Sequence, residues 1–194
     1  MRAGAGGGVS NATLLAPTIS RVEAEAVIPA IAADGSLYRV GKLEAHERDL
    51  HHLAISVFLM DGTRLLIQRR ALGKYHCGGL WANACCTHPR WGEAAAECAR
   101  RRLREELGVE VPLEQRGVVE YAAPVGNGLH ERERVTMFRG EVRAPELAVR
   151  PDPAEVMDWR WIERDALARE IAETPERFTP WLRIYLARYP GCDF

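Results

Sequence analysis

Two short apolar runs on either side of an Asp-Gly pair give the clearest strand signal in the chain. Residues 53–60 and 64–68 have apolar centres, and Asp61-Gly62 lies between them. An Asp-Gly pair between such runs favours a tight hairpin turn. We therefore predict two antiparallel strands joined at this turn.

A four-residue repeat predicts one strong helix near the middle of the chain. Small and apolar side chains recur at every fourth position from Ala95 to Leu107, so they share one face of a helix over residues 93–107. Gly108 follows directly and supplies the stop signal, because glycine readily adopts the left-handed conformation that ends many helices.

The other hydrophobic segments predict further strands and helices around these elements. Strands are expected over residues 25–29, 37–40, 109–111, 118–122, 131–142 and 156–162, helices over residues 164–172 and 179–189, and irregular chain over residues 73–88. Strands interleaved with one central helix and a helical end define an α/β or α+β class with a mixed sheet.

The same pattern divides the chain into one main domain with extensions, which suits its 194 residues. The first segment is rich in glycine and alanine and lacks periodicity, which is typical of disorder. We expect a disordered tail over residues 1–18, a hairpin and metal-ligand segment over residues 19–49, a catalytic domain over residues 50–185 and a C-terminal tail over residues 186–194.

Composition and charge narrow the classes of partner. The 26 Lys and Arg residues nearly balance the 27 Asp and Glu residues, so no basic excess indicates nucleic acid or an anionic membrane as partner. The longest apolar run is far shorter than the roughly 20 residues of a membrane-spanning helix. Five cysteines without a Cys-any-any-Cys pair indicate reduced thiols. We expect a cytoplasmic monomer or homodimer that binds a small molecule.

The end of the predicted helix carries the first chemical signal. Arg102, Glu105 and Glu106 are spaced three and four positions apart, so they share one helix face. Two neighbouring carboxylates can hold a hard cation such as Mg²⁺, and the Arg102 guanidinium is a forked donor for phosphate oxygens. Without further context, such residues more often form a solvated face with ion pairs.

Further residues around this helix give that context, because they resemble the Nudix box. The matching positions are Glu93, Arg101, Leu103, Glu105, Glu106, Gly108 and Val109. Two positions depart from it: Thr87 stands where the first glycine belongs, and Arg102 where the first helical glutamate belongs. A Nudix hydrolase carries three carboxylates on this face, whereas here the face has two negative charges and one positive charge.

A second motif precedes the helix over residues 81–88, with the pattern Trp-any-Asn-any-any-Cys-any-His. Together with residues 52–54, 69–74 and 131–133, it resembles the type 1 isopentenyl-diphosphate isomerases over about residues 35–185. The combination with an altered Nudix box is highly specific. The resemblance implies a Nudix fold, with a mixed sheet sandwiched by helices, and conversion of isopentenyl diphosphate into dimethylallyl diphosphate.

The resemblance also implies a metal site and two proton-transfer groups. The implied metal ligands are His46, His52, His88, Glu131 and Glu133. Imidazoles combined with carboxylates suit Mn²⁺ or Zn²⁺ better than Mg²⁺ alone. Cys86 and Glu133 are the candidates for proton transfer on opposite faces of the substrate, with the direction of transfer left open.

The remaining implied roles concern the cation and the diphosphate. Tyr121 is expected to hold the proton of the glutamate, and the ring face of Trp181 to stabilise a carbocation. Glu106 is expected to hold a Mg²⁺ ion that bridges to the diphosphate, together with the backbone carbonyl of Cys86. The residues expected to grip the diphosphate are Lys42, Arg70, Lys74 and Arg102.

Some neighbours of these residues are expected to have no catalytic or ligand role. Cys85 is expected to point into the core, as free cysteines commonly do. His51 competes with His52 for the ligand role, and His52 is preferred because Leu53-Ala54 follow it. Ordinary structural or exposed positions are expected for His76 and His130, and an exposed one for Arg69.

Three other functions are weighed against the isomerase. A Nudix pyrophosphohydrolase of a nucleoside diphosphate derivative needs the missing helical glutamate and gives Cys86 no role. A non-catalytic binding or metal-storage module predicts that a Cys86→Ala variant keeps its function. A flavin-dependent isomerase of the same reaction needs a barrel larger than this chain.

Overall fold

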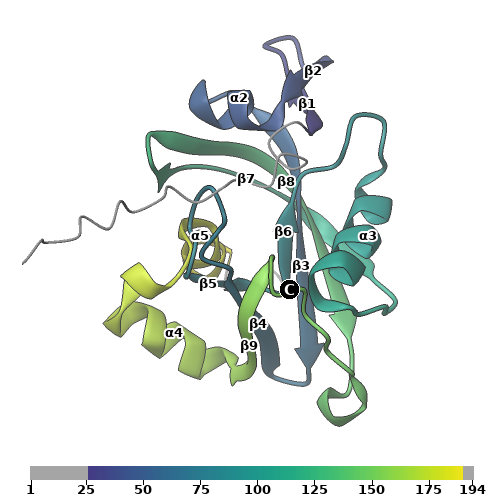
Figure 1. Cartoon of the computed structure of the whole chain (residues 1–194), viewed down its shortest axis with the longest axis vertical. Coiled ribbons are helices and arrows are strands. Elements are labelled where there is room, and N and C mark those ends of the chain that lie inside the picture. The colour runs from purple at the N-terminus through teal and green to yellow at the C-terminus, as the bar shows by residue number, and fades with distance from the viewer. Residues whose placement is uncertain (1–25, 190–194) are drawn as a thin grey trace, which may run out of the picture.

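The computed structural model describes residues 26–189, which form a mixed β-sheet with helices on both faces (Figure 1). The strands are β1 Val27–Ile31, β2 Leu37–Gly41, β3 His52–Asp61, β4 Arg64–Arg70, β5 Trp81–Asn83, β6 Cys85–Thr87, β7 Glu114–Gly126, β8 Leu129–Glu141 and β9 Val156–Glu163. The α-helices are α2 Lys42–Glu47, α3 Ala95–Leu107, α4 Arg164–Glu173 and α5 Pro180–Arg188. Short 3-10 helices span Ala144–Glu146 and Pro175–Arg177.

Strand β3 is the centre of the sheet. It pairs antiparallel with β1, β4 and β6, and parallel with β8. The parallel register places His52 opposite Glu133. Strand β7 continues the sheet beyond β8, and β5 and β9 continue it beyond β4. The parallel pairing therefore brings the first residue of β3 next to the middle of β8.

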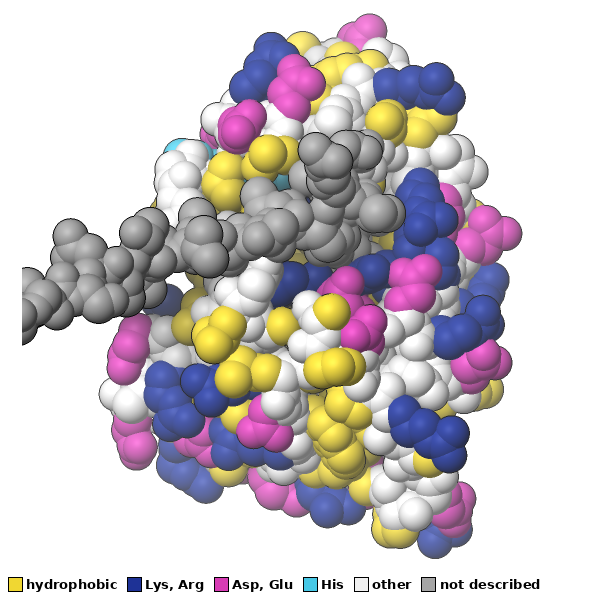
Figure 2. All heavy atoms as spheres, in the orientation of Figure 1, with side chains coloured by type: hydrophobic (Ala, Val, Ile, Leu, Met, Phe, Trp, Pro, Cys, Tyr) yellow, Lys and Arg dark blue, Asp and Glu magenta, His cyan; other side chains and the backbone are white. Residues whose placement is uncertain are grey.

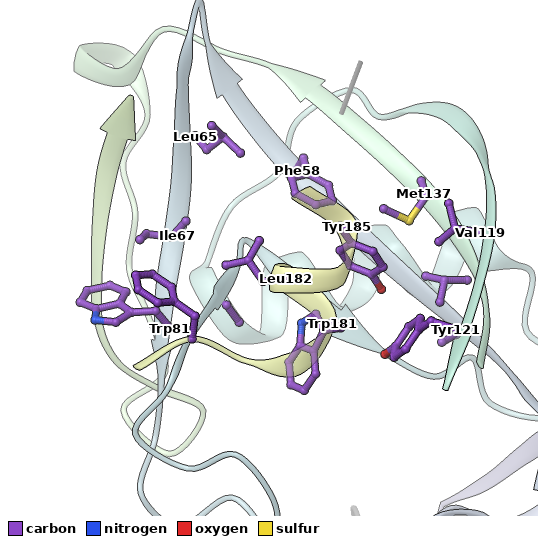
Figure 3. Packing of buried hydrophobic residues seen from close by; sticks show 14 of the residues in the cluster. Phe58, Leu65, Ile67, Trp81, Val119, Tyr121, Met137, Trp181, Leu182 and Tyr185 are labelled. Carbon is purple, nitrogen blue, oxygen red and sulfur yellow. The ribbon is translucent and has the colours of Figure 1, made fainter. Parts of the chain in front are cut away.

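Both faces of β3 are buried, because successive side chains of a strand point to opposite faces. Ile55 and Val57 pack in the cluster that contains the apolar face of α3. Phe58 packs on the other face, in the cluster that contains Leu182 and Tyr185 of α5 (Figure 3). Burying one such side chain contributes about 1.5–3 kcal/mol. The predicted class, a mixed sheet between helices, is confirmed.

Helix α3 ends where the sequence predicts. Gly108 has a φ of 65°, and its amide donates to the carbonyls of Arg104 and Leu103. A Cβ atom at this position would lie 2.7 Å from the carbonyl oxygen of Arg150. Glycine is required here both for the left-handed backbone and for this close approach.

Two predictions of local structure are wrong. Residues 73–88 are not irregular throughout, because β5 and β6 lie within them. These strands have three residues each, which is too short for a visible alternation, and pairing with β4 and β3 forms them. Residues 109–111 are not a strand. Val109 is buried against the α3 cluster instead, as the hydrophobic contact that follows a glycine helix stop.

The hairpins, the long strands and the C-terminal helices agree with the sequence predictions to within a few residues. Helix α2 was not predicted, because its six residues are mostly charged. The expected disordered tail, and most of the expected C-terminal tail, lie outside the described residues. Within the described range, no helix is long and apolar enough to cross a bilayer.

Candidate active site

Four buried side chains from four parts of the fold converge at one end of β3. His46 comes from α2, His52 begins β3, His88 follows β6, and Glu133 lies in β8. One ligand atom from each lies within 4.8 Å of all the others. Two ligand atoms on opposite sides of a shared ion lie about 4.2 Å apart, given metal–nitrogen distances of about 2.1 Å. The group can therefore hold a divalent metal ion.

Backbone carbonyls set the tautomers of two of these histidines. His46 Nδ1 lies 2.7 Å from the carbonyl oxygen of Lys42, and His52 Nδ1 lies 2.6 Å from that of Leu50. A carbonyl only accepts, so each Nδ1 carries the proton and each Nε2 offers a lone pair to the cluster. This arrangement is typical of metal-ligating histidines.

Burial keeps two imidazoles of the cluster neutral, which is the form that binds metals. The pKa of His46 falls to about 4, because of burial and then the neighbouring His52. Burial likewise lowers the pKa of His88 to about 3, although its hydrogen bond to Glu133 opposes the shift. His88 Nε2 lies 2.8 Å from Glu133 Oε1 and 3.1 Å from His52 Nε2.

Tyr121 links the two predicted carboxylates. Glu131 and Glu133 alternate onto the buried face of β8, as predicted, and Tyr121 lies opposite Glu133 in β7. The Tyr121 hydroxyl lies 2.8 Å from Oε2 of each carboxyl. Burial, followed by the charge of Glu133, raises the pKa of Glu131. Burial also acts to raise the pKa of Glu133, but its contacts with His52 and His88 lower it overall. The two carboxyls therefore differ in proton affinity: Glu131 holds a proton more readily than Glu133 does.

The alternation of β6 separates the two adjacent cysteines. Cys85 is fully buried on the α3 side, as predicted. Cys86 faces the other way, with its Sγ 2.7 Å from Ser56 Oγ and 3.0 Å from Asn83 Oδ1. Burial raises the pKa of the Cys86 thiol, despite its hydrogen bond with Ser56. Cys86 therefore holds its proton at neutral pH and is suited to proton transfer.

Two residues that are linked to this thiol by a chain of hydrogen bonds, Ser56 and Tyr185, were missed by the sequence analysis. Ser56 Oγ donates to the Tyr185 hydroxyl at 3.2 Å. The signal for Ser56 was its position as a polar residue inside an apolar strand, where a hydroxyl needs a partner. The signal for Tyr185 was its spacing four residues after Trp181, which puts both on one face of α5. Figure 3 shows Trp181 and Tyr185 on the same helix, and the Tyr185 ring meets the Tyr121 ring edge-on at 5.7 Å.

All four predicted diphosphate ligands line one cavity together with both proton-transfer candidates. The lining includes Lys42, Arg70, Lys74, Arg102, Cys86, Tyr121, Glu131, Glu133 and Trp181. The Arg70 guanidinium lies 5.3 Å from the centre of the Trp181 ring. Lys74 and Arg102 both pair with Glu155, the latter at 3.2 Å. The site thus places four cations beside a thiol, two carboxyls and aromatic rings.

Glu106 is buried, whereas its neighbour Glu105 is exposed. Its carboxylate accepts from Gln68 Nε2 at 2.8 Å and from Arg102 Nη2 at 2.8 Å. Burial acts to raise the pKa of Glu106, but the charges of Arg102 and Lys74 lower it overall. Glu106 is therefore an ionised carboxylate at neutral pH, held by protein donors.

Three histidines and one arginine were expected to lie outside the site, and the structure shows where each of them lies. His130 is exposed and His51 is half-buried outside the metal group, which supports the choice of His52. The expectation that Arg69 is exposed is wrong, because it is half-buried and its Nε donates to the Gly79 carbonyl. His76 is buried and lines the cavity, with Nε2 3.8 Å from Glu131 Oε1.

The mixed sheet and the altered Nudix helix beside the cavity define a Nudix-fold protein, and a family comparison agrees. Residues 50–182 match the family described as NUDIX domain. A solved structure from Deinococcus radiodurans has a TM-score of 0.69 at 17% identity, covering 87% of this chain and 99% of the other. A MutT protein from Methanosarcina mazei gives 0.57 at 17% identity, covering 73% and 94%. These structures support the fold.

Curated relatives narrow the family. A protein of Cereibacter sphaeroides named isopentenyl-diphosphate Delta-isomerase is 64% identical over 159 residues, which are 79% of this chain and 87% of the relative. A protein of Rhodobacter capsulatus with the same name is 54% identical over 173 residues, which are 88% and 97%. The chain belongs to this isopentenyl-diphosphate Delta-isomerase family within the Nudix fold.

Proposed function

We propose that this protein is an enzyme that converts isopentenyl diphosphate into dimethylallyl diphosphate, a step that supplies isoprenoid precursors. The observation that carries the proposal is the cavity shared by the Cys86 thiol, the Glu133 carboxyl and a group of cationic side chains. The curated relatives, which are named for this isomerisation, support the same reaction.

The reaction moves a double bond by adding one proton and removing another. A proton added to the terminal alkene carbon gives a tertiary carbocation, and loss of a proton from the adjacent methylene carbon forms the new double bond. Cys86 and Glu133 are the two groups that give and take these protons, and the atoms balance because one proton enters and one leaves. A positioned acid or base contributes a factor of about 10²–10⁴ to such a step.

The interior of the cavity is suited to a carbocation. Water would trap a tertiary cation as an alcohol, so the site must exclude it. Trp181 and Tyr121 are buried and line the cavity. An aromatic ring face stabilises a cation within about 6 Å by about 0.5–2 kcal/mol. Trp181 is our candidate for this role, and Tyr121 fixes the orientation of the two carboxyls that it contacts.

We assign the metal ligands to His46, His52, His88, Glu131 and Glu133. The tautomers of His46 and His52 fit this role, since both Nε2 lone pairs face the group. Nitrogen and oxygen donors together suit Mn²⁺ or Zn²⁺. When bound, the ion supplies a positive charge that holds the carboxyls in place and lowers their proton affinity.

The diphosphate is the part of the substrate that the cationic side chains bind. Arg70, Lys74 and Arg102 are buried or half-buried cations in the cavity, and Lys42 lies at its edge near the metal group. We assign a Mg²⁺ ion that accompanies the diphosphate to Glu106 and the backbone carbonyl of Cys86. Glu106 accepts from Arg102 and Gln68 in this structure, and the remaining lone pairs of its carboxylate would hold the ion.

The alternative hydrolase is disfavoured by Arg102. Its guanidinium occupies the helical position where the hydrolase needs a third carboxylate, and it forms ion pairs with Glu106 and Glu155. The helix face therefore lacks the charge that gathers several metal ions around an attacking water. A cytoplasmic location and a monomeric or homodimeric state remain predictions.

Incubation of the metal-loaded protein with isopentenyl diphosphate in heavy water tests the proposal. We expect deuterium in the methyl group of dimethylallyl diphosphate, because the added proton comes from an exchangeable group. The Cys86→Ala and Glu133→Gln variants should form little of this product. Release of phosphate without a deuterated isomer would instead indicate the hydrolase.

A further inference from the structure

His76 is a buried histidine to which the known motifs assign no role. It lies in the loop between β4 and β5, and its side chain is 5% exposed. Its ring stacks on that of His46, with centroids 5.4 Å apart, and meets the Trp181 ring edge-on at 6.0 Å. It therefore lies between the metal group and the aromatic wall of the cavity.

Hydrogen bonding does not account for the position of His76. Among the described residues, its Nδ1 is buried without a hydrogen-bond partner. Its Nε2 faces Glu131 Oε1 at 3.8 Å, which is too long for a hydrogen bond. Buried polar atoms normally have a partner, and an exception calls for an explanation such as an ion.

The spacing around His76 is that of metal ligands. Ligand atoms of His46, His76 and Glu131 all lie within 4.8 Å of one another. Two atoms bound to one ion at about 2.1 Å each are separated by about 3–4.2 Å. The gap of 3.8 Å between His76 and Glu131 falls in this range.

The two groups of ligands share one residue and lie side by side. His46 belongs to both groups. Its Nδ1 donates to the carbonyl of Lys42, so only Nε2 is left to bind a metal. One imidazole nitrogen has a single lone pair and binds a single ion. Two ions would compete for this lone pair, so the two groups can be served together only by a single ion that draws their ligand atoms closer.

We propose that His76 is an additional ligand of the metal ion that the proposed function assigns to the other histidines and the two glutamates. The ion then has six ligands from the chain: His46, His52, His76, His88, Glu131 and Glu133. Six protein ligands leave no position for water. This suits an ion that orients and polarises carboxyls in a site that must stay dry. It also favours ions that accept six ligands including nitrogen, such as Mn²⁺, over Mg²⁺.

Nuclear magnetic resonance can count the bound histidines directly. The full chain, labelled with ¹⁵N in its histidines, is loaded with ¹¹³Cd²⁺, a diamagnetic ion that accepts six ligands. A one-bond coupling between cadmium and a ring nitrogen marks each ligand. We expect couplings at four of the six histidines, with His51 and His130 uncoupled. Spectra of His76→Ala and His130→Ala variants assign the signals.

The outcomes separate this inference from the proposed function on which it rests. Couplings at His46, His52 and His88 without His76 would overturn the inference and leave the proposed metal site intact. No coupling at any histidine would overturn the metal site itself. A second readout is Mn²⁺ affinity, measured by competition with a chelating dye. We expect His76→Ala to weaken binding about tenfold or more, and the exposed His130→Ala to leave it unchanged.

Discussion

Arg102 Nη2 lies 2.8 Å from Glu106 Oε1, one turn further along α3, and both side chains are buried. In the hydrolase pattern the position of Arg102 carries a glutamate, so a single residue exchanges a repulsive carboxylate for an ion pair. The same guanidinium reaches Glu155 at 3.2 Å. Arg102 therefore connects two elements of the site: α3, where it pairs with Glu106, and the loop before β9, where it pairs with Glu155.

The first prediction concerns this ion pair. Arg102→Ala leaves the buried carboxylate of Glu106 without its main partner. Breaking a buried pair in this way costs about 3–5 kcal/mol, so we expect urea unfolding to give a correspondingly lower free energy. We also expect the KM for isopentenyl diphosphate to rise in this variant, because a phosphate contact is lost.

Arg104→Ala is the matched control for Arg102. Arg104 lies on the exposed face of the same helix and pairs with the exposed Glu110. An exposed pair contributes about 0–1 kcal/mol, so this variant should keep both stability and KM. If the two variants behave alike, Arg102 has no special role in the site.

The second prediction separates the reactive thiol from the other cysteines. Cys86→Ala should lower kcat by a factor of about 10²–10⁴, because one of two proton-transfer groups is gone. Its KM should change little, since the phosphate ligands are intact. Cys98→Ala is the control: Cys98 is a buried residue of α3 and belongs to the cluster on the other face of the sheet. Steady-state kinetics measure both variants. An equal fall of kcat in the two would argue against Cys86 as a proton-transfer group.

The sequence predicted some of this site because local periodicity carries over directly into geometry. The alternation of β8 placed Glu131 and Glu133 on one face. The helical spacing of Arg102 and Glu106 likewise predicted a shared face. In each case the relevant contact lies within one element, where the side-chain period of 2 or 3.6 residues decides it.

Contacts between distant elements were not predictable in the same way. The pairing of His52 with Glu133 depends on the parallel register of β3 and β8, which no spacing reveals. The contact of Ser56 with Tyr185 depends on how α5 packs on the sheet. His76 lies in a loop without periodicity, so only the folded chain brings it to His46. Tertiary packing, rather than local pattern, decides all three.

The third prediction concerns metal removal. A ligand that binds only the folded state stabilises it by about 2.7 kcal/mol at a concentration of 100 times its Kd. We therefore expect a chelator to lower the melting temperature, and added Mn²⁺ or Zn²⁺ to restore it. The effect should be lost in His52→Ala, whose ring lies in the metal group, and kept in His51→Ala. Calorimetry with and without the ion measures the difference.

The last prediction addresses the hydroxyl network behind Cys86. Ser56 Oγ contacts the Cys86 thiol at 2.7 Å and donates to Tyr185 at 3.2 Å, so it orients the thiol without contacting the substrate. Ser56→Ala and Tyr185→Phe each remove one end of this contact. We expect kcat to fall in both while KM is nearly unchanged, because the phosphate ligands are untouched.

A double-mutant cycle distinguishes positioning from loose packing. If Tyr185 acts on the thiol through Ser56, the loss of kcat in the double variant should be smaller than the sum of the two single losses on a logarithmic scale. Leaving a buried donor without its acceptor costs about 1–3 kcal/mol. Tyr185→Phe should therefore lower stability more when Ser56 is present than when it is introduced into the Ser56→Ala variant. Additive effects on both kcat and stability would mean that the two hydroxyls act independently, and that Ser56 and Tyr185 do not form one network with the thiol.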